Sequence, residues 1–248
     1  MTVIPEIPTI DLSSYIRPDA TPEERTGVIE DVRSACSRYG FLQVKGHGVP
    51  LATQREVLES CRRLFDLSQK EKDSLSLKNN PARRGYERIG EQVLDAKALP
   101  DCKEDFTKEP VVNLKLLHYP KHISQDKRQF GAGAHTDFGA ITILLQQPGK
   151  DGLQVYHEPN NAWLPVPAVE DSLVINIGDL VNKWTDGKYS STLHRVVNAS
   201  DGDRYSVPCF YHGDLSATNP FKPGDGSETV EEHIRRKFDN SYGLTEKS

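Results

Sequence analysis

The segment FGAGAHTDFGAITILLQQ, residues 130–147, places a histidine and an aspartate just before an apolar run that is rich in β-branched residues. His135 and Asp137 stand two positions apart. In an extended chain, residues i and i+2 project from the same face, so the imidazole and the carboxylate point toward one place. The segment therefore predicts a strand that carries two potential metal ligands at its edge.

A third ligand is expected from a strand that the fold brings alongside. The segment STLHRVVNASDGDRYSVP, residues 191–208, contains His194 within a second strand-like pattern. Two histidines and one carboxylate on one face of an octahedron leave the other positions open, as in non-haem Fe(II) sites. An isolated HxD pair is weak evidence, because such pairs also occur in surface turns with a satisfied histidine.

Two polar residues beyond His194 make the pattern more specific. Arg204 lies ten residues further along the chain, and in a strand it shares a face with Ser206. A guanidinium fork beside a hydroxyl is a receptor for a carboxylate. The order and spacing of these elements indicate a metal centre with a carboxylate site next to it.

At these residues the sequence resembles the Fe(II)/2-oxoglutarate-dependent dioxygenases, in particular the branch that includes isopenicillin N synthase. The resemblance covers most of the chain. It is specific for the metal site and says little about the substrate. The motifs that carry it are HTD at 135–137, LHRV around His194, RYS at 204–206, LHYP at 117–120 and NIGD at 176–179.

The resemblance implies a mainly β fold with flanking helices, a double-stranded β-helix or jelly-roll barrel. It implies that Fe(II) is held by the catalytic residues His135, Asp137 and His194. The co-substrate 2-oxoglutarate would bind Arg204 and Ser206, and dioxygen would be the oxidant. The expected reaction oxidises a small organic molecule by hydroxylation or desaturation, plausibly in secondary metabolism, and releases succinate and carbon dioxide.

Four aromatic residues are further candidates. Tyr119 matches a family tyrosine whose hydroxyl touches the co-substrate, although a plain core tyrosine is an equal alternative. Phe138 follows the ligands, and counting by twos from Ser206 brings Phe210 to its face, so both are candidate pocket walls or core residues. Tyr86 matches a family position near the substrate mouth, with a surface aromatic that pins a loop as the alternative.

Two other functions stay open on the sequence. One is an oxidase like isopenicillin N synthase, which uses the same iron site without 2-oxoglutarate. The other is a truncated, non-catalytic barrel. The second arises because relatives carry several dozen residues between the segment PDCKEDF, 100–106, and the LHYP strand, whereas this chain passes directly through TKEPVV. An apolar outer sheet face would then be exposed, covered by a partner or rearranged.

The remaining pattern divides into a helical and loop region at 1–106 and a β-rich core at 107–248, packed as one unit. Helices are expected after the capping box at Thr21, from Leu51, and from Thr229, and residues 75–101 are expected to form a loop. Short extended runs are expected at 7–12 and 41–44. The predicted core strands are 114–119, 140–147, 153–157, 163–166, 173–177, 193–197 and 205–212.

The composition of the chain limits the classes of partner that it can bind. The 248 residues carry a formal charge of −5 with both signs scattered, so no basic face indicates nucleic acid or an anionic membrane. No apolar segment has the length of a membrane span, so we expect a cytoplasmic protein with a small-molecule partner and an open oligomeric state. The four cysteines have no metal-like spacing and are expected to be reduced, mostly buried thiols. His47 is expected to be structural. The other histidines outside the motif are expected to lie on the surface or next to the ligands rather than to bind metal, and His212, which shares the parity of Arg204, is expected to lie beyond the site.

Overall fold

A computed structural model of the protein describes residues 5–80, 85–94, 97–99, 101–108, 112–121, 129–197 and 202–241. Its helices are α1 (Ser13–Ile16), α2 (Pro22–Arg38), α3 (Leu51–Phe65), α4 (Gln69–Ser74), α5 (Asp179–Trp184) and α6 (Val230–Ser241), with 3-10 turns at η1 (Leu77–Asn79) and η2 (Glu158–Asn160). Its strands are β1 (Thr9–Asp11), β2 (Phe41–Lys45), β3 (Gly85–Glu87), β4 (Glu104–Lys108), β5 (Val112–Tyr119), β6 (Ala132–His135), β7 (Ile141–Gln146), β8 (Leu153–His157), β9 (Ala162–Pro165), β10 (Leu173–Ile177), β11 (His194–Val196) and β12 (Arg204–Tyr211).

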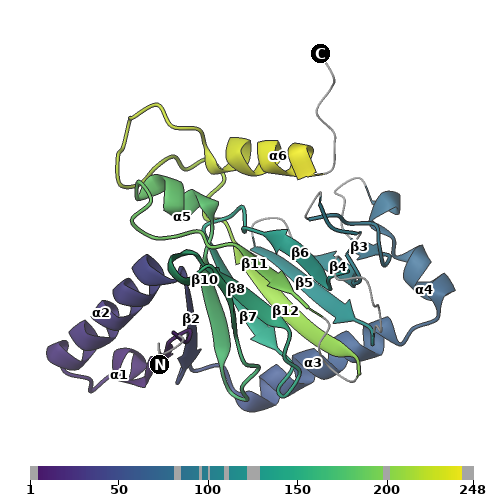
Figure 1. Ribbon diagram of the computed structural model, residues 1–248, viewed down its shortest axis with the longest axis horizontal. Helices are drawn as coiled ribbons and strands as arrows, with labels where there is room; N and C mark the ends of the chain where they lie inside the picture. The colour runs from purple at the N-terminus through teal and green to yellow at the C-terminus, as the bar shows by residue number, and fades with distance from the viewer. Residues whose placement is uncertain are drawn as a thin grey trace.

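The strands form two sheets that share one apolar core. The large sheet has the order β1-β2-β10-β7-β12-β5-β4-β3, and the small sheet has the order β6-β11-β8-β9 (Figure 1). The core cluster takes residues from both sheets, among them Phe41 and Leu117 from the large sheet and Val155 and Val196 from the small one. Because both sheets contribute, the core lies between them. The predicted mainly β, jelly-roll fold is confirmed.

Helices cover part of the outer face of the large sheet. The predicted capping box is present at the start of α2, where Thr21 and Glu24 exchange side-chain and backbone hydrogen bonds. α2 packs on β2 and β10, and α3 packs across β5 and β12 through a cluster that includes Cys61 and Phe65. Three of the four thiols are buried, and no cysteine of the chain forms a disulfide, as expected.

One strand of the structure falls in the segment that the sequence predicted to be loop. β3 pairs with β4 at the end of the large sheet, and η1 lies shortly before it. Gly85 has a φ of +139°, and a Cβ there would lie 2.1 Å from the carbonyl oxygen of Leu75. Only glycine allows the chain to approach itself so closely before entering the sheet. The polar composition around β3 hid this strand from the hydrophobic pattern.

The outer face next to α3 keeps an apolar strip open to solvent. Leu114 and Ile143 both oppose Cys209 across the sheet, and they are 39% and 37% exposed. Val112 and Tyr211 form the next pair along the same face and are also exposed. Of the three alternatives considered from the sequence, this strip is exposed in the single chain, whereas α3 covers its continuation at Leu116.

Candidate active site

Three potential ligand atoms converge between the two sheets. His135 ends β6, Asp137 lies two residues beyond it, and His194 begins β11. The two strands pair with His194 directly opposite His135. The Asp137 Oδ1 atom lies 3.9 Å from His135 Nε2 and 3.7 Å from His194 Nε2, and the ligand atoms of all three residues fall within 4.8 Å of one another. The predicted set is thus brought together by strand pairing.

Hydrogen bonds to the backbone fix the tautomer of both histidines. His135 Nδ1 lies 2.7 Å from the carbonyl oxygen of Gly133, and His194 Nδ1 lies 3.0 Å from that of Thr192. A carbonyl only accepts, so each Nδ1 must carry the hydrogen and donate it. Each Nε2 then presents a lone pair to the common centre, which is the state a metal ligand requires.

The aspartate is oriented by two donors from the large sheet. Thr142 Oγ1 donates to Asp137 Oδ2 at 2.5 Å, and Asn176 Nδ2 donates to the same oxygen at 2.7 Å. Thr142 and Asn176 oppose each other on β7 and β10, so the pair reaches the carboxylate from one side. Oδ1 is left facing the two histidines. Asn176 and Asp137 are 39 residues apart in the chain, so the sequence pattern does not reveal this contact.

Electrostatics favour a neutral His135 and an ionised Asp137. Burial and the neighbouring His194 together lower the pKa of His135 to about 4. Burial raises the pKa of Asp137, but both histidines and the hydrogen bonds from Thr142 and Asn176 outweigh it, so the pKa is below its usual value. Two neutral imidazoles and one ionised carboxylate fit a divalent transition metal such as Fe(II).

A cavity of about 160 Å³ opens beside these ligands. Its walls come from both sheets and include Phe41, Leu153 and Val196 as well as the three candidate ligands. Arg204, Ser206 and Tyr119 also line it, and all three are at most 2% exposed. Arg204 pairs with Tyr119 across β12 and β5, so the strands bring these candidate co-substrate residues together as well.

Arg204 is a buried cation whose hydrogen-bond partners are neutral. Its guanidinium donates to Gln146 Oε1 at 2.9 Å, to the Lys150 carbonyl at 3.2 Å and to Ser206 Oγ at 3.5 Å, and it lies 4.8 Å over the Tyr119 ring. Burial lowers the pKa of Arg204. Within the part of the chain that the structure describes, no carboxylate forms an ion pair with it. Buried charges are normally paired, so this guanidinium is suited to an anionic ligand.

The other candidate residues divide into those that line the cavity and one that does not. Phe138 and Phe210 line the cavity, as does His212, which was expected to lie beyond the site. His212 directly follows β12, and Asn113 of the neighbouring β5 lies 3.3 Å from its Nε2, so the cavity extends farther along these strands than the sequence indicated. Tyr86 is not among the residues that line the cavity: it is 3% exposed, packs under α3, and its hydroxyl donates to Glu104. It is neither a surface aromatic nor a wall of this cavity.

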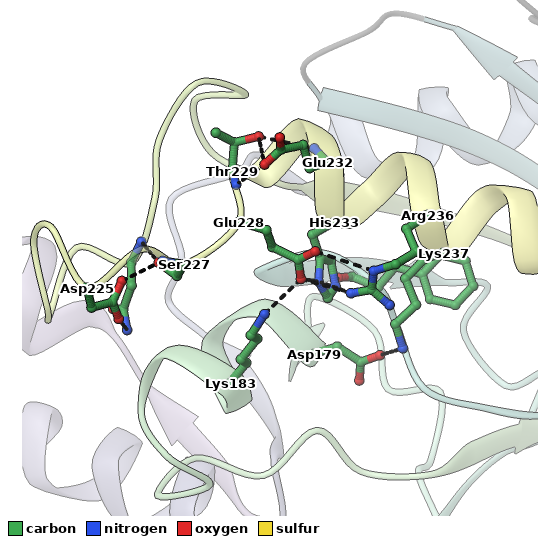
Figure 2. A network of polar contacts seen from close by, with 12 residues as sticks. Asp179, Lys183, Asp225, Ser227, Glu228, Thr229, Glu232, His233, Arg236 and Lys237 are labelled. Carbon is green, nitrogen blue, oxygen red and sulfur yellow. Dashed lines mark hydrogen bonds and ion pairs between the residues drawn. The ribbon is translucent and has the colours of Figure 1, made fainter.

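Helix α6 lies against the ligand segment through a polar network (Figure 2). His233 Nε2 lies 3.1 Å from the carbonyl oxygen of Phe138, the residue after Asp137, and His233 Nδ1 lies 2.9 Å from Glu228. Glu228 also accepts from Lys183 of α5 and from Arg236 of α6, each at 2.8 Å. The network therefore joins α5, α6 and the segment that carries a candidate ligand. Among the described residues, the remaining histidines outside the cavity are not part of the metal cluster, and His122 lies outside the described residues.

Two family models match the chain. Residues 110–213 match the model of the 2OG-Fe(II) oxygenase superfamily, and residues 7–123 match the model described as non-haem dioxygenase in morphine synthesis N-terminal. The chain is 43% identical to the 2-oxoglutarate-dependent dioxygenase caaD of Aspergillus niger, over 96% of this chain and 94% of that protein. It is 42% identical to the 2-oxoglutarate-dependent dioxygenase traH of Penicillium crustosum, over 97% and 94%.

Solved structures share the fold. A full-length Neurospora crassa protein in complex with alpha-KG superposes with a TM-score of 0.84 at 21% identity, covering 95% of this chain and 96% of that one. The rice dioxygenase for auxin oxidation superposes with a TM-score of 0.72 at 21% identity, covering 95% and 96%. These structures show the fold, and the family models with the relatives of 43% and 42% identity show the family: the chain belongs to the 2OG-Fe(II) oxygenase superfamily and is a non-haem Fe(II)/2-oxoglutarate-dependent dioxygenase.

The alignment with caaD also bears on the length of the chain. It extends over 305 positions, whereas this chain has 248 residues, so at least 57 residues of that relative have no counterpart here.

None of the described helices is both long enough and apolar enough to cross a membrane.

Proposed function

We propose that Nε2 of His135, Oδ1 of Asp137 and Nε2 of His194 hold the Fe(II), and that Arg204 receives the distal carboxylate of 2-oxoglutarate. The observation that carries this proposal is the buried guanidinium of Arg204, whose partners are neutral oxygens on the wall of the same cavity as the ligand triad. A carboxylate there forms charge-assisted, bidentate hydrogen bonds.

Ser206 and Tyr119 complete the carboxylate site. Ser206 Oγ already lies 3.5 Å from Arg204 Nη1, so a carboxylate that meets the guanidinium also meets this hydroxyl. Tyr119 opposes Arg204 across the sheet and lines the cavity. Burial raises the pKa of the Tyr119 hydroxyl, so it stays protonated and can donate.

Bound Fe(II), 2-oxoglutarate and dioxygen supply the oxidising chemistry, with release of succinate and carbon dioxide. The chain's own part is to position a single C–H bond and to exclude water. Phe138 and Phe210 line the cavity, and Pro208, which lies between Ser206 and Phe210 on the same strand, lines it as well. These three side chains form the apolar boundary of the cavity on the substrate side. This arrangement is suited to hydroxylation or desaturation of a small organic molecule.

Comparisons support a small-molecule substrate and a place in secondary metabolism. The Neurospora crassa protein was also solved in complexes with alpha-KG that contain thymine or 5-formyluracil, both small molecules. The relatives with high identity are fungal 2-oxoglutarate-dependent dioxygenases. From these proteins we carry over to this chain only the class of substrate, a small organic molecule.

The test compares ligand variants with a histidine outside the site. His135→Ala and Asp137→Ala should bind Fe(II) at least tenfold more weakly and should lose 2-oxoglutarate decarboxylation, with far-ultraviolet circular dichroism unchanged. His47→Ala is the matched control, because the Nδ1 of His47 accepts a hydrogen bond from the Val49 amide at a turn away from the triad. Normal iron binding and turnover in the triad variants would refute the assignment.

A further inference from the structure

The carboxylate of Asp179 lies between the two segments that carry the candidate iron ligands. Asp179 is the first residue of α5 and comes shortly after β10. Its Oδ1 atom accepts a hydrogen bond from Ser191 Oγ at 2.7 Å, and Ser191 stands just before His194 in the chain. Its Oδ2 atom accepts a hydrogen bond from Thr136 Oγ1 at 3.4 Å, and Thr136 stands between the other two candidate ligands. One side chain therefore bridges both ligand segments.

The backbone at the start of α5 holds the turn that follows Asp137. The Asp179 amide donates to the Asp137 carbonyl at 2.8 Å, and the amides of the residues before and after it donate to the Ala140 and Gly139 carbonyls at 2.9 Å and 3.1 Å. A Cβ on Gly178 would lie 2.2 Å from the Gly139 carbonyl oxygen, so glycine permits this close approach. The turn and α5 thus form one hydrogen-bonded unit, and the Asp179 side chain reaches from this unit toward the third ligand.

Helix α6 supplies a cation to the same carboxylate. Lys237 Nζ lies 2.6 Å from Asp179 Oδ2, and Figure 2 shows this contact beside the network of Glu228. The side chains of Lys237 and Asp179 are 29% and 17% exposed, so the pair is partly shielded from water. A partly buried ion pair loses less of its strength to solvent than an exposed one does. Lys237 therefore helps to hold the carboxylate with Oδ1 toward Ser191.

The strands that carry the two histidines pair over a short and irregular stretch. His194 opposes His135, and Val196 opposes Ala132, with a shift of register between these two positions. An irregularity of this kind disrupts the ladder locally, so backbone hydrogen bonds hold the strands less firmly there. The contacts of Asp179 on both sides are thus placed to decide how closely the ligand atoms converge.

We propose that Asp179 is a positioning residue of the iron site: its carboxylate, held by Lys237, keeps the segment of His135 and Asp137 at the distance from the segment of His194 that Fe(II) requires. This inference rests on the proposed function, since it assumes that the triad holds the metal. Asp179 acts through its neighbours, because it is not among the described residues that line the cavity.

The experiment compares two aspartates that are each paired with a lysine. Asp179→Asn keeps the size of the side chain but loses the charge and one of the two acceptor oxygens, and in an anaerobic titration its dissociation constant for Fe(II) should rise by about tenfold. Lys237→Met should shift the constant in the same direction, and Lys237→Arg should keep it near the wild-type value. Asp186→Asn is the matched control, because Asp186 pairs with Lys222 at 2.7 Å on the surface, and its affinity for Fe(II) should not change.

A second control separates position from stability. Val230 is 0% exposed and packs with Leu180 between α6 and α5, so Val230→Ala should lower the unfolding temperature by several degrees while the hydrogen bonds of Asp179 stay in place. Its affinity for Fe(II) should equal that of the wild type. At saturating Fe(II) and 2-oxoglutarate, the visible charge-transfer band should change its position in Asp179→Asn, because the band depends on ligand geometry, and should stay unchanged in Val230→Ala.

The outcomes distinguish the two proposals. Wild-type protein that does not bind Fe(II), or a His135→Ala variant that binds it normally, refutes the proposed function and this inference with it. If the triad binds iron but Asp179→Asn has the wild-type affinity and the wild-type band, Asp179 is not a positioning residue. Equal losses of iron affinity in Asp179→Asn and Val230→Ala would assign the effect to stability and would also overturn the inference.

Discussion

The side-chain amide of Asn176 donates to Asp137 Oδ2 at 2.7 Å, although the two residues belong to different parts of the chain. Asn176 is 3% exposed and comes from the large sheet, whereas Asp137 follows a strand of the small sheet. This hydrogen bond, with that of Thr142, decides which carboxylate oxygen faces the histidines. The large sheet therefore orients a candidate ligand that belongs to the segment after a strand of the small sheet.

Removing either donor should weaken iron binding. Asn176→Ala and Thr142→Val should each raise the dissociation constant for Fe(II) by about tenfold to a hundredfold, because the carboxylate loses the partner that orients it. Anaerobic metal titration measures this directly. Asn182→Ala is the control, since Asn182 donates to the Tyr189 carbonyl away from the ligands. Equal iron affinity in wild type and Asn176→Ala would show that this orientation has no effect.

Helix α6 should stabilise the ligand segment through His233. His233→Phe keeps a ring of similar size at a position that is 3% exposed but removes the contacts to Glu228 and to the Phe138 carbonyl. A buried carbonyl left without its donor costs about 2 kcal/mol, so thermal unfolding should shift by several degrees. Arg235→Ala, on the exposed face of α6, should change stability by less than about 0.5 kcal/mol. Equal unfolding temperatures in both variants would contradict the role of His233.

Acid should weaken the buried cluster around Glu104. Lys72 Nζ lies 2.8 Å from Glu104, His118 Nδ1 lies 2.8 Å from it, and the Tyr86 hydroxyl also donates to it. Burial raises the pKa of Glu104, but these donors outweigh burial and hold it below the usual value of 4.5. A carboxyl whose pKa is lowered by folding stabilises the protein above pH 4.5, and this contribution is lost as the pH falls through the folded pKa.

Glu104→Gln tests this dependence. At pH 7 the variant should be less stable by on the order of 3 kcal/mol, because Lys72 is left buried without its charged partner. The difference from wild type should shrink as the pH falls from 4.5, where Glu104 is protonated in the unfolded chain, toward the lower pKa at which the folded protein also takes up the proton. Urea unfolding at pH 7 and at pH 4 measures both values. A difference that is constant with pH would contradict the ionised state of Glu104.

Replacing Arg204 separates charge from geometry at the co-substrate site. Arg204→Lys keeps a positive charge but loses the planar fork, and we expect the dissociation constant of 2-oxoglutarate to rise by about tenfold. Arg204→Gln loses both and should raise it by more than about a hundredfold. Equilibrium dialysis of iron-loaded protein gives these constants. A smaller loss in Arg204→Gln than in Arg204→Lys would contradict a carboxylate site at this residue.

Alternation in a strand places i and i+2 on one face, and this predicted the pairing of His135 with Asp137 and of Arg204 with Ser206. The addition of His194 depended on a second strand expected alongside, and the roles of all these residues came from the family resemblance. The fold class followed from the resemblance and from the many short strands. What alternation cannot show is which strand lies opposite, and for this reason the pairing of Thr142 with Asn176 and the place of His212 on the wall were not predicted.

Segments with polar composition were less predictable. β3 is short, and the close approach of Gly85 to Leu75 depends on a fold that local pattern does not encode. Lys115 looks like a surface lysine in the sequence NLKLLHYP, yet strand parity turns it into the cavity with Tyr119. For Tyr86 the sequence left open a place near the substrate mouth or a surface position, and the structure instead buries it against Glu104, apart from the residues that line the cavity.

The most direct test of the central claim is an anaerobic titration of the purified protein with Fe(II) and 2-oxoglutarate, followed by visible absorption. Chelation of the co-substrate should produce a weak visible charge-transfer band that is absent with either component alone. The band should disappear in His135→Ala and should need far more 2-oxoglutarate in Arg204→Gln. Folded, iron-loaded wild-type protein that shows no band, or an Arg204→Gln variant with an unchanged titration, would contradict the account.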